Sequence, residues 1–79
     1  MDEGKKYKYK NRMSLSSMDQ IFRDADADRV SLSAKKSLRD LLEKIAFKVA
    51  EKSIKVSENS GRKTVKGKDI ELIGGRFLE

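Results

Sequence analysis

The feature that constrains this chain most is the stretch from Leu32 to Asn59, 28 residues that contain neither Pro nor Gly. Apolar residues recur along it at spacings of three and four, which is the period of one continuous amphipathic helix. They are Leu38, Leu41, Leu42, Ile45, Ala46, Val49, Ala50 and Ile54. Such a helix is about 42 Å long, whereas a compact domain of about 65 residues is only roughly 28 Å across. The apolar stripe cannot be buried within its own chain, so the sequence predicts a partner chain.

The ends of the long helix are marked by residues that cap helices. Ser31 fits the N-cap position, where its hydroxyl accepts a hydrogen bond from a free backbone N–H. Asn59-Ser60-Gly61 follows the last apolar residue, and Gly61 fits the left-handed position just past a helix C-terminus. The sequence therefore predicts one uninterrupted helix from Leu32 to Asn59.

A short helix is predicted on each side of the long one. Ser17 and Gln20 have the spacing of a capping box and place the start of the first helix at Ser17. The last helix is expected from about Gly67 to Ile73, with Asp69 in its first turn. The predicted fold class is therefore all-α, with helices in the order short, long, short.

The two connectors between these helices carry basic residues and some strand character. In an antiparallel pair of long helices, the first connector of one chain lies beside the second connector of its partner. Val30 and Thr64-Val65 are then expected to pair as a short parallel bridge between chains. This arrangement gathers Arg29 of one chain with three basic residues of the other, namely Arg62, Lys63 and Lys66.

Charge is the strongest signal in the composition. The net charge of +6 and the 41% of charged residues favour a polyanionic partner such as nucleic acid. The alternative is a highly charged, thermally robust surface. On the long helix the polar face mixes both signs, and the spacing predicts the ion pairs Asp40–Lys44 and Glu51–Lys55. Most of that charge is expected to be a solvated face.

Several kinds of chemistry are excluded by the residue types present. The chain has no Cys and no His, so it lacks a thiol nucleophile, an imidazole base and the ligands of a zinc cluster. The Asp24-x-Asp26-x-Asp28 spacing fails as a calcium loop, because Arg29 stands where a Gly is needed and Lys35 where a Glu is needed. No apolar run is long enough for a membrane span. We expect no enzyme activity, no cofactor, no metal and no membrane partner.

The first 13 residues differ from the rest of the chain. They hold five basic and two acidic residues and show no helical period. This composition is typical of a flexible tail that adds charge to a DNA contact. The expected organisation is therefore a basic tail at residues 1–13 and one helical domain at residues 14–79.

Two runs of the sequence resemble the loop regions of a known family. They are Asp24-Ala25-Asp26-Ala27-Asp28-Arg29-Val30-Ser31 and Gly61-Arg62-Lys63-Thr64-Val65-Lys66-Gly67-Lys68-Asp69-Ile70-Glu71-Leu72. Both are similar to the loops of archaeal histones. The resemblance covers roughly residues 18 to 77, with no gap needed between Ile21 and Phe77. It implies the histone fold, an intertwined handshake dimer, and wrapping of double-stranded DNA with little sequence specificity.

The resemblance also implies roles for individual residues. Arg29 corresponds to the arginine inserted into the minor groove, and Thr64 to the hydroxyl that holds it or a phosphate. Lys63 and Lys66 correspond to phosphate-binding lysines. The full expected DNA-binding set is Arg23, Arg29, Arg62, Lys63, Thr64 and Lys66. Arg62 and Asp69 correspond to an ion pair that shapes the second loop. The dimer interface is expected at Leu38, Leu41, Leu42, Ile45, Val49 and Ile54.

Contacts between dimers follow less directly from the resemblance, because the sequence departs from the family there. The expected dimer–dimer residues are Val56, Asn59, Asp69 and Leu72. Asn59 stands where many members have a His, Asp26 where stacking members often have a Gly, and Gln20 where a first-helix Arg is common. Tetramers or longer superhelical assemblies on DNA are therefore left open.

The sequence thus predicts a homodimeric, chromosome-associated protein of the cytoplasm that wraps, bends and compacts DNA. The alternative is a histone-fold subunit that pairs with a different chain, such as a histone paralogue or a partner in a transcription- or chromosome-associated complex. The presence of Arg29, Lys63 and Thr64 together favours the DNA role.

Overall fold

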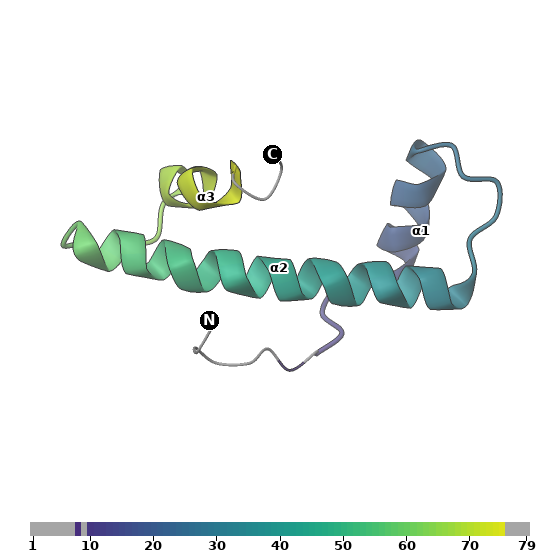
Figure 1. Ribbon diagram of the computed structural model, residues 1–79, viewed down its shortest axis with the longest axis horizontal. Helices are drawn as coiled ribbons and strands as arrows, with labels where there is room; N and C mark the ends of the chain where they lie inside the picture. Colours follow the sequence, from purple (N-terminus) through teal and green to yellow (C-terminus); the bar gives the residue numbers. More distant parts are fainter. Residues whose placement is uncertain (1–7, 9, 76–79) are drawn as a thin grey trace. The chain divides into compact units, whose positions relative to one another are not determined.

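The computed structural model describes residues 8 and 10–75 of the chain. These residues form three helices and no strand: α1 (Leu15–Asp24), α2 (Leu32–Asn59) and α3 (Gly67–Gly74) (Figure 1). The order short, long, short confirms the all-α prediction. The chain divides into two units, Met1–Lys44 and Ile45–Glu79, and α2 contributes residues to both. Most of the predicted tail, including residues 1–7 and 9, lies outside the described residues.

In the first unit, α1 begins earlier than the sequence predicted. The N-cap is Ser14, whose backbone is extended at φ −83° and ψ 149°, and the start predicted at Ser17 was wrong. Ser14 Oγ accepts a hydrogen bond from the Ser17 backbone N–H at 3.0 Å and donates to Ser17 Oγ at 2.7 Å. Both serines can cap a helix, and capping at Ser14 brings the half-buried Leu15 into the first turn.

A charged cluster joins α1 to the first turns of α2. Asp19 of α1 accepts from Arg23 Nε at 2.7 Å and lies 3.3 Å from Lys35 Nζ of α2. The hydrogen bond from Arg23 is the main reason that the pKa of Asp19 lies below its ordinary value. The chain before α1 is also tied to α2, because the Met13 backbone N–H donates to the buried Glu43 carboxylate at 2.9 Å.

The ends of α2 lie where the sequence placed them. Ser31 Oγ accepts from the Ala34 backbone N–H at 3.1 Å and caps the N-terminus. At the C-terminus Gly61 has φ +74°, and the backbone N–H groups of Arg62 and Gly61 donate to Ser57 O and Glu58 O, both at 2.9 Å. This pair of bonds is a Schellman motif, which satisfies carbonyl groups at the end of the helix.

The C-terminus of α1 is closed by the same motif with a different residue at the left-handed position. The backbone N–H groups of Ala27 and Asp26 donate to Phe22 O at 3.0 Å and Arg23 O at 2.9 Å. Asp26 has φ +70°, a conformation that Gly adopts without steric cost and Asp tolerates at some cost. Backbone geometry alone therefore favours Gly at this position.

Replacing Asp26 by Gly is expected to raise the free energy of unfolding by on the order of 0.5–1 kcal/mol, because it relieves the left-handed strain. Thermal or denaturant unfolding followed by circular dichroism measures the change. Asp28→Gly is the matched control, since Asp28 lies in the same loop without a positive φ. Equal effects of the two substitutions would contradict this explanation.

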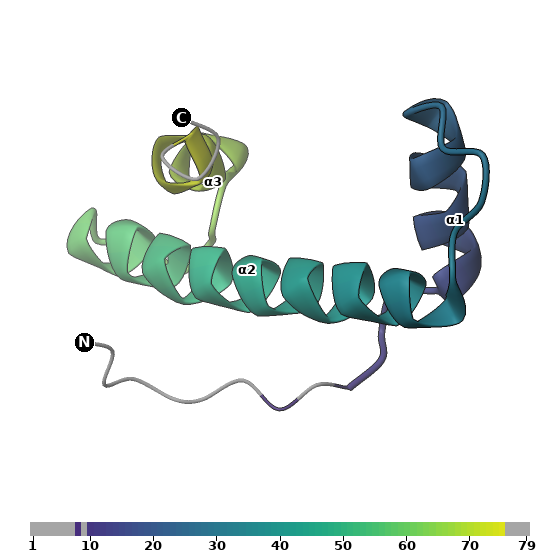
Figure 2. The same cartoon turned by 45° about the vertical axis from the view of Figure 1, so that its right-hand side comes forward.

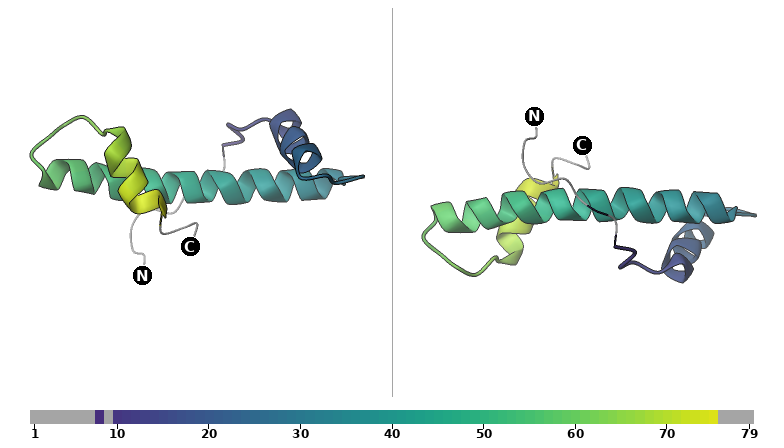
Figure 3. Two further views of the ribbon diagram at one scale, coloured as in Figure 1. Left: turned by 90° about the horizontal axis from the view of Figure 1, so that it is seen from above. Right: turned by 90° about the horizontal axis from the view of Figure 1, so that it is seen from below.

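In the second unit, α3 lies against the C-terminal part of α2 (Figure 2). Ser53 and Ser57 of α2 are 0% and 1% exposed, and Ser53 Oγ donates to the Asp69 backbone carbonyl of α3 at 3.5 Å. Ser57 Oγ donates to Ile54 O within α2 at 2.8 Å, so its buried hydroxyl is satisfied. Small side chains here let α3 approach α2 closely. Figure 3 shows the loop that returns the chain from the end of α2 to α3.

Apolar burial within a single chain is very small. Among the described residues, Met18 is the only buried hydrophobic residue, at 3% exposed. Large apolar side chains on all three helices remain exposed. They include Ile21 (48%), Leu32 (58%), Leu41 (54%), Ile54 (45%), Ile70 (41%) and Leu72 (57%). A chain with so little core lacks the main favourable contribution to folding, which agrees with the predicted need for a partner.

Candidate nucleic-acid interface

Two loops carry most of the residues expected to bind nucleic acid. The first loop comprises residues 25–31 and joins α1 to α2, and the second comprises residues 60–66 and joins α2 to α3. Each begins with a Schellman motif, so the direction in which the chain leaves the helix is fixed by backbone hydrogen bonds. The two loops belong to different units of the chain.

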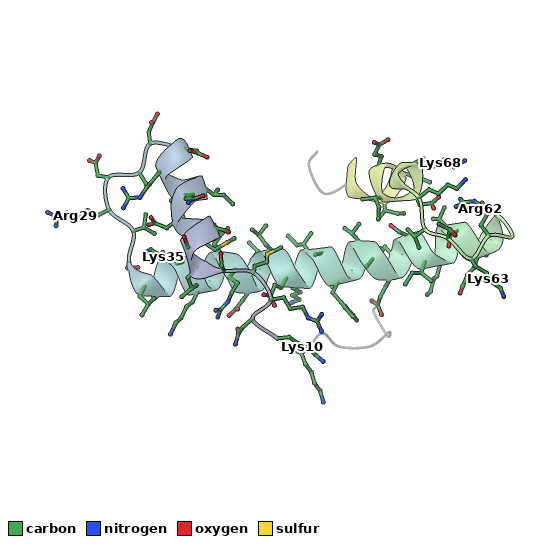
Figure 4. The ribbon with its side chains drawn as sticks, turned by 180° about the vertical axis from the view of Figure 1, so that it is seen from behind. Lys10, Arg29, Lys35, Arg62, Lys63 and Lys68 are labelled. Carbon is green, nitrogen blue, oxygen red and sulfur yellow. The ribbon has the colours of Figure 1, made fainter. Side chains whose placement is uncertain are left out.

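In the first loop, Arg29 is the exposed cation. Its side chain makes no ion pair with any described residue and points away from the helices of its unit (Figure 4). Ser31, two residues after Arg29, caps α2, so Arg29 is held close to a fixed helix end. A guanidinium presented in this way is available to a phosphate or a groove of DNA.

The second loop is organised by one carboxylate. Asp69 is 2% exposed and accepts from Arg62 Nη2 at 2.8 Å, from Arg62 Nη1 at 3.1 Å and from the Lys66 backbone N–H at 2.8 Å. Arg62 Nη1 also donates to the Thr64 carbonyl at 2.9 Å. The structure thus contains the Arg62–Asp69 ion pair that the family resemblance implied. Together these bonds tie the middle of the loop to the first turn of α3.

The same contacts divide the basic residues of this loop into two groups. Arg62 uses its guanidinium for bonds within the chain, and its side chain is only 22% exposed. Lys63, Lys66 and Lys68 are exposed and form no ion pair with any described residue (Figure 4 labels Lys63 and Lys68 beside Arg62). Their ammonium groups, together with the exposed Thr64, are what this loop offers to an anion.

Lys68 was not among the predicted site residues, and the structure places it with them. It lies in the first turn of α3, where a positive charge is unfavourable because the helix dipole is positive there. A lysine at such a position is a signal that the sequence alone could have given. An anion bound at this end of α3 would compensate for the unfavourable charge.

Arg23 was predicted to bind DNA, but its surroundings differ from those of the loop cations. Its guanidinium is held by Asp19 in an ion pair of the i,i+4 type, which raises the pKa of Arg23 and neutralises part of its field. Its side chain is nevertheless 69% exposed. A phosphate contact from Arg23 would have to share or displace Asp19.

The predicted dimer-interface residues lie on α2, and none of them is buried within the single chain. Leu41 and Ile54 are 54% and 45% exposed. The other four are half-buried: Leu38, Leu42, Ile45 and Val49. All six side chains are aliphatic, so the stripe is suited to burial against apolar side chains of another chain.

The predicted dimer–dimer residues differ strongly in their exposure. Leu72 is 57% exposed and Asn59 is exposed, whereas Val56 is half-buried. Asp69 is buried within its own chain, where its two oxygens already accept three hydrogen bonds. Little of the Asp69 carboxylate therefore remains for a neighbouring dimer in this conformation.

Protonation of Asp69 is expected to weaken the fold at low pH. The hydrogen bond from Arg62, followed by that from the Lys66 backbone, lowers the pKa of Asp69 from 3.8 to about 2. Because the folded-state pKa is depressed, the stabilisation is present above pH ~4 and is lost as the pH falls toward ~2. Asp69→Asn should lower the melting temperature at pH 6 and reduce its fall between pH 4 and pH 2. An unchanged pH profile in that variant would contradict the assignment, and Asp28→Asn is the exposed control.

Other kinds of site find no support in the described part of the chain. Among residues 8 and 10–75, no group of three or more acidic side chains is arranged to hold a metal ion. No helix formed by those residues is long and apolar enough to cross a membrane. The cations of the two loops are the most prominent chemical feature that remains.

Comparison with known proteins agrees with this geometry. Residues 12–73 match the family described as histone-like transcription factor (CBF/NF-Y) and archaeal histone. The chain is 38% identical over 60 residues to one of the subunits of the archaeal histone HAN1 of Thermococcus zilligii, covering 76% of this chain and 90% of that protein. It is 42% identical over 50 residues to probable archaeal histone 3 of Methanocaldococcus jannaschii, covering 63% of this chain and 75% of that protein. The chain therefore belongs to the family of histone-like transcription factors and archaeal histones, and it is a histone-like DNA-binding protein with the all-α histone fold.

Proposed function

We propose that two copies of this chain form a handshake dimer that bends and compacts double-stranded DNA with little sequence specificity. The observation that carries the proposal is the set of exposed cations, in the two loops and at the start of α3, without a carboxylate partner among the described residues: Arg29, Lys63, Lys66 and Lys68. The role is one of binding and packaging DNA, not of catalysis, and it implies association with the chromosome.

The dimer is supported by the very small core that the described residues of a single chain form. Only Met18 is a buried hydrophobic residue among those described, whereas the α2 stripe is half-buried, with Leu41 and Ile54 exposed. A second α2 packed antiparallel on the stripe would bury it and supply the missing hydrophobic stabilisation. The same arrangement would place Arg29 of one chain beside Thr64 of the other, with Val30 and Val65 in a short bridge between the chains.

The proposed contacts are made mainly to the DNA backbone and not to the bases. Lysine ammonium groups and backbone amides neutralise phosphates wherever the minor groove faces the dimer, and Arg29 enters that groove. Lys63, Lys66 and Lys68 act as phosphate ligands, and Arg62 acts chiefly by holding the loop in shape. Sequence preference then comes mainly from how easily a DNA segment bends.

The test is the salt dependence of binding to short duplexes of unrelated sequence. We expect the logarithm of the binding constant to fall linearly with the logarithm of salt concentration, with a slope of about −0.9 for each phosphate contacted. Affinities for stiff and flexible duplexes should differ less than the affinities measured at low and high salt. A binding constant that does not change with salt concentration would refute the proposal.

A second candidate is a heterodimer, in which the partner is a different histone-fold chain. The relative in Thermococcus zilligii is named as one of the subunits of a histone, which favours a second, different chain as partner for that protein. The purified chain distinguishes the two candidates. If it is unfolded alone at micromolar concentration and folds only with a paralogue, the heterodimer is the functional unit.

Assembly beyond the dimer is proposed to form on DNA, as tetramers or longer arrays. The exposed Leu72 and Asn59 are available for such a contact, whereas the buried Asp69 is not unless its loop rearranges. Contacts between dimers are therefore expected to be weaker than the contact within a dimer. Nuclease digestion of reconstituted complexes checks this, because the protected DNA lengths count the dimers.

A further inference from the structure

We propose that a row of lysines on the side of α2 opposite α3 binds a second DNA duplex, so that one dimer bridges two DNA segments. The site is the α2 lysine row, defined as Lys48, Lys52 and Lys55, all of which are exposed. Spacings of four and three residues place these lysines on one side of the helix, about 6 Å and about 4.5 Å apart along its axis. The inference rests on the proposed DNA binding and goes beyond it.

The lysine row is not neutralised by the described part of its own chain. The sequence predicted the ion pair Glu51–Lys55, and this prediction was wrong, because Lys55 has no ion pair with any described residue. The same holds for Lys48 and Lys52. The companion prediction, Asp40–Lys44, was wrong as well, since Asp40 is paired with its neighbour Arg39 at 3.2 Å.

The arrangement is unfavourable for the isolated helix. Lys48 and Lys52 are four residues apart and Lys52 and Lys55 three, and like charges at these spacings repel and destabilise a helix. Glu51 lies three residues after Lys48 and four before Lys55 and offsets part of that repulsion, but it forms no ion pair with a described residue. A polyanion bound along the row would remove it, which is the physical reason for assigning a ligand here.

The α2 lysine row lies on the side of α2 opposite α3. Ser53 and Ser57 mark the side of α2 that α3 covers. At 3.6 residues per turn, Lys55 lies about 160° around the helix from both serines, so it points roughly away from α3. Lys66 and Lys68 lie at the start of α3. A DNA duplex bound to Lys66 and Lys68 would therefore have to pass around α2 to reach the α2 lysine row.

The chemistry of the row fits a phosphate backbone better than a protein surface. Lysine is depleted in the cores of protein–protein interfaces, which are built around aromatic and apolar anchors. Sequence-tolerant DNA contacts, in contrast, are made largely by Lys and Arg to phosphates. Three lysines on one line with no aromatic residue among them match the second pattern.

The experiment uses the full chain and two duplexes, one tethered to beads and one fluorescent and free. The wild type is expected to capture the free duplex on the beads. The variant Lys48→Gln/Lys52→Gln/Lys55→Gln should reduce capture by on the order of tenfold while its affinity for a single short duplex changes by less than about twofold. Gln keeps a helix propensity close to that of Lys, and circular dichroism checks the fold.

The matched control is Lys63→Gln/Lys66→Gln/Lys68→Gln, which removes the same charge and should weaken single-duplex binding and capture together. The inference is overturned if the row variant captures the free duplex as well as the wild type does. It is also overturned if the row variant loses single-duplex affinity and capture in parallel, or if the wild type binds one duplex and captures none. Binding of polyglutamate tests an acidic protein as the alternative ligand. If the row variant captures the free duplex normally but no longer binds polyglutamate, the row binds an acidic protein and the inference fails. A wild type that binds no duplex at all would refute the proposed function itself.

Discussion

Replacing Ile45 by Asp is expected to leave the chain largely unfolded at micromolar concentration. Ile45 lies in the middle of the α2 apolar stripe and is only half-buried in a single chain. In the dimer a carboxylate at this position would lose its water without gaining a partner. Loss of the apolar contact and burial of the charge should together cost more than about 3 kcal/mol, a large part of the stability of a small domain. Far-ultraviolet circular dichroism and sedimentation measure the result.

Ser37→Asp is the matched control for that substitution. Ser37 is an exposed residue of the same helix and gains the same charge, so the control accounts for helix propensity and net charge. We expect it to remain helical and dimeric. If Ile45→Asp kept full helicity and the wild-type mass, the stripe would not be the dimer interface.

The largest effect on DNA binding is expected from removing the three lysines around the second loop that have no ion pair with a described residue. Lys63→Gln/Lys66→Gln/Lys68→Gln takes away up to six phosphate contacts in a dimer. The affinity for a short duplex should fall by on the order of 100-fold or more near 0.1 M salt, and the salt slope should become shallower by up to about 5. Fluorescence anisotropy at several salt concentrations measures both quantities.

Arg62 offers a contrasting case in the same loop. Because its guanidinium is bound to Asp69 and the Thr64 carbonyl, Arg62→Gln should lower the melting temperature and change the salt slope little. The lysine variant should show the opposite pattern. If the lysine variant kept its affinity and slope, or if Arg62→Gln produced the larger change in slope, the division of roles within this loop would be wrong.

Much of the fold could be predicted from the sequence, because strong local signals coincide in α2. Its apolar period, the Ser31 cap and Gly61 all indicate the same boundaries, and the structure has them there. The start of α1 was missed because Ser14 and Ser17 are both good caps, and local sequence does not rank them. Asp26 could not be predicted to be left-handed, since Asp shows this preference far less clearly than Gly.

The candidate site was predictable in composition but not in detail. Family resemblance implied the Arg62–Asp69 pair, but only the structure shows that Asp69 binds both terminal nitrogens of the guanidinium that was also assigned to DNA. Lys68 was missed although its position at the positive end of α3 is a signal. The ion pairs expected on α2 failed because spacing permits such a pair without enforcing it, and exposed pairs stabilise little. The α2 lysine row could not be predicted, because the sequence placed Lys55 in an ion pair that the structure lacks.

The central claim, that the chain folds only with a partner chain, is tested most directly by sedimentation of the purified protein together with circular dichroism over a range of concentrations. We expect a mass of two 9.0 kDa chains and a helical signal that falls as dilution dissociates the dimer. A single chain that keeps its full helical signal at every concentration would contradict it.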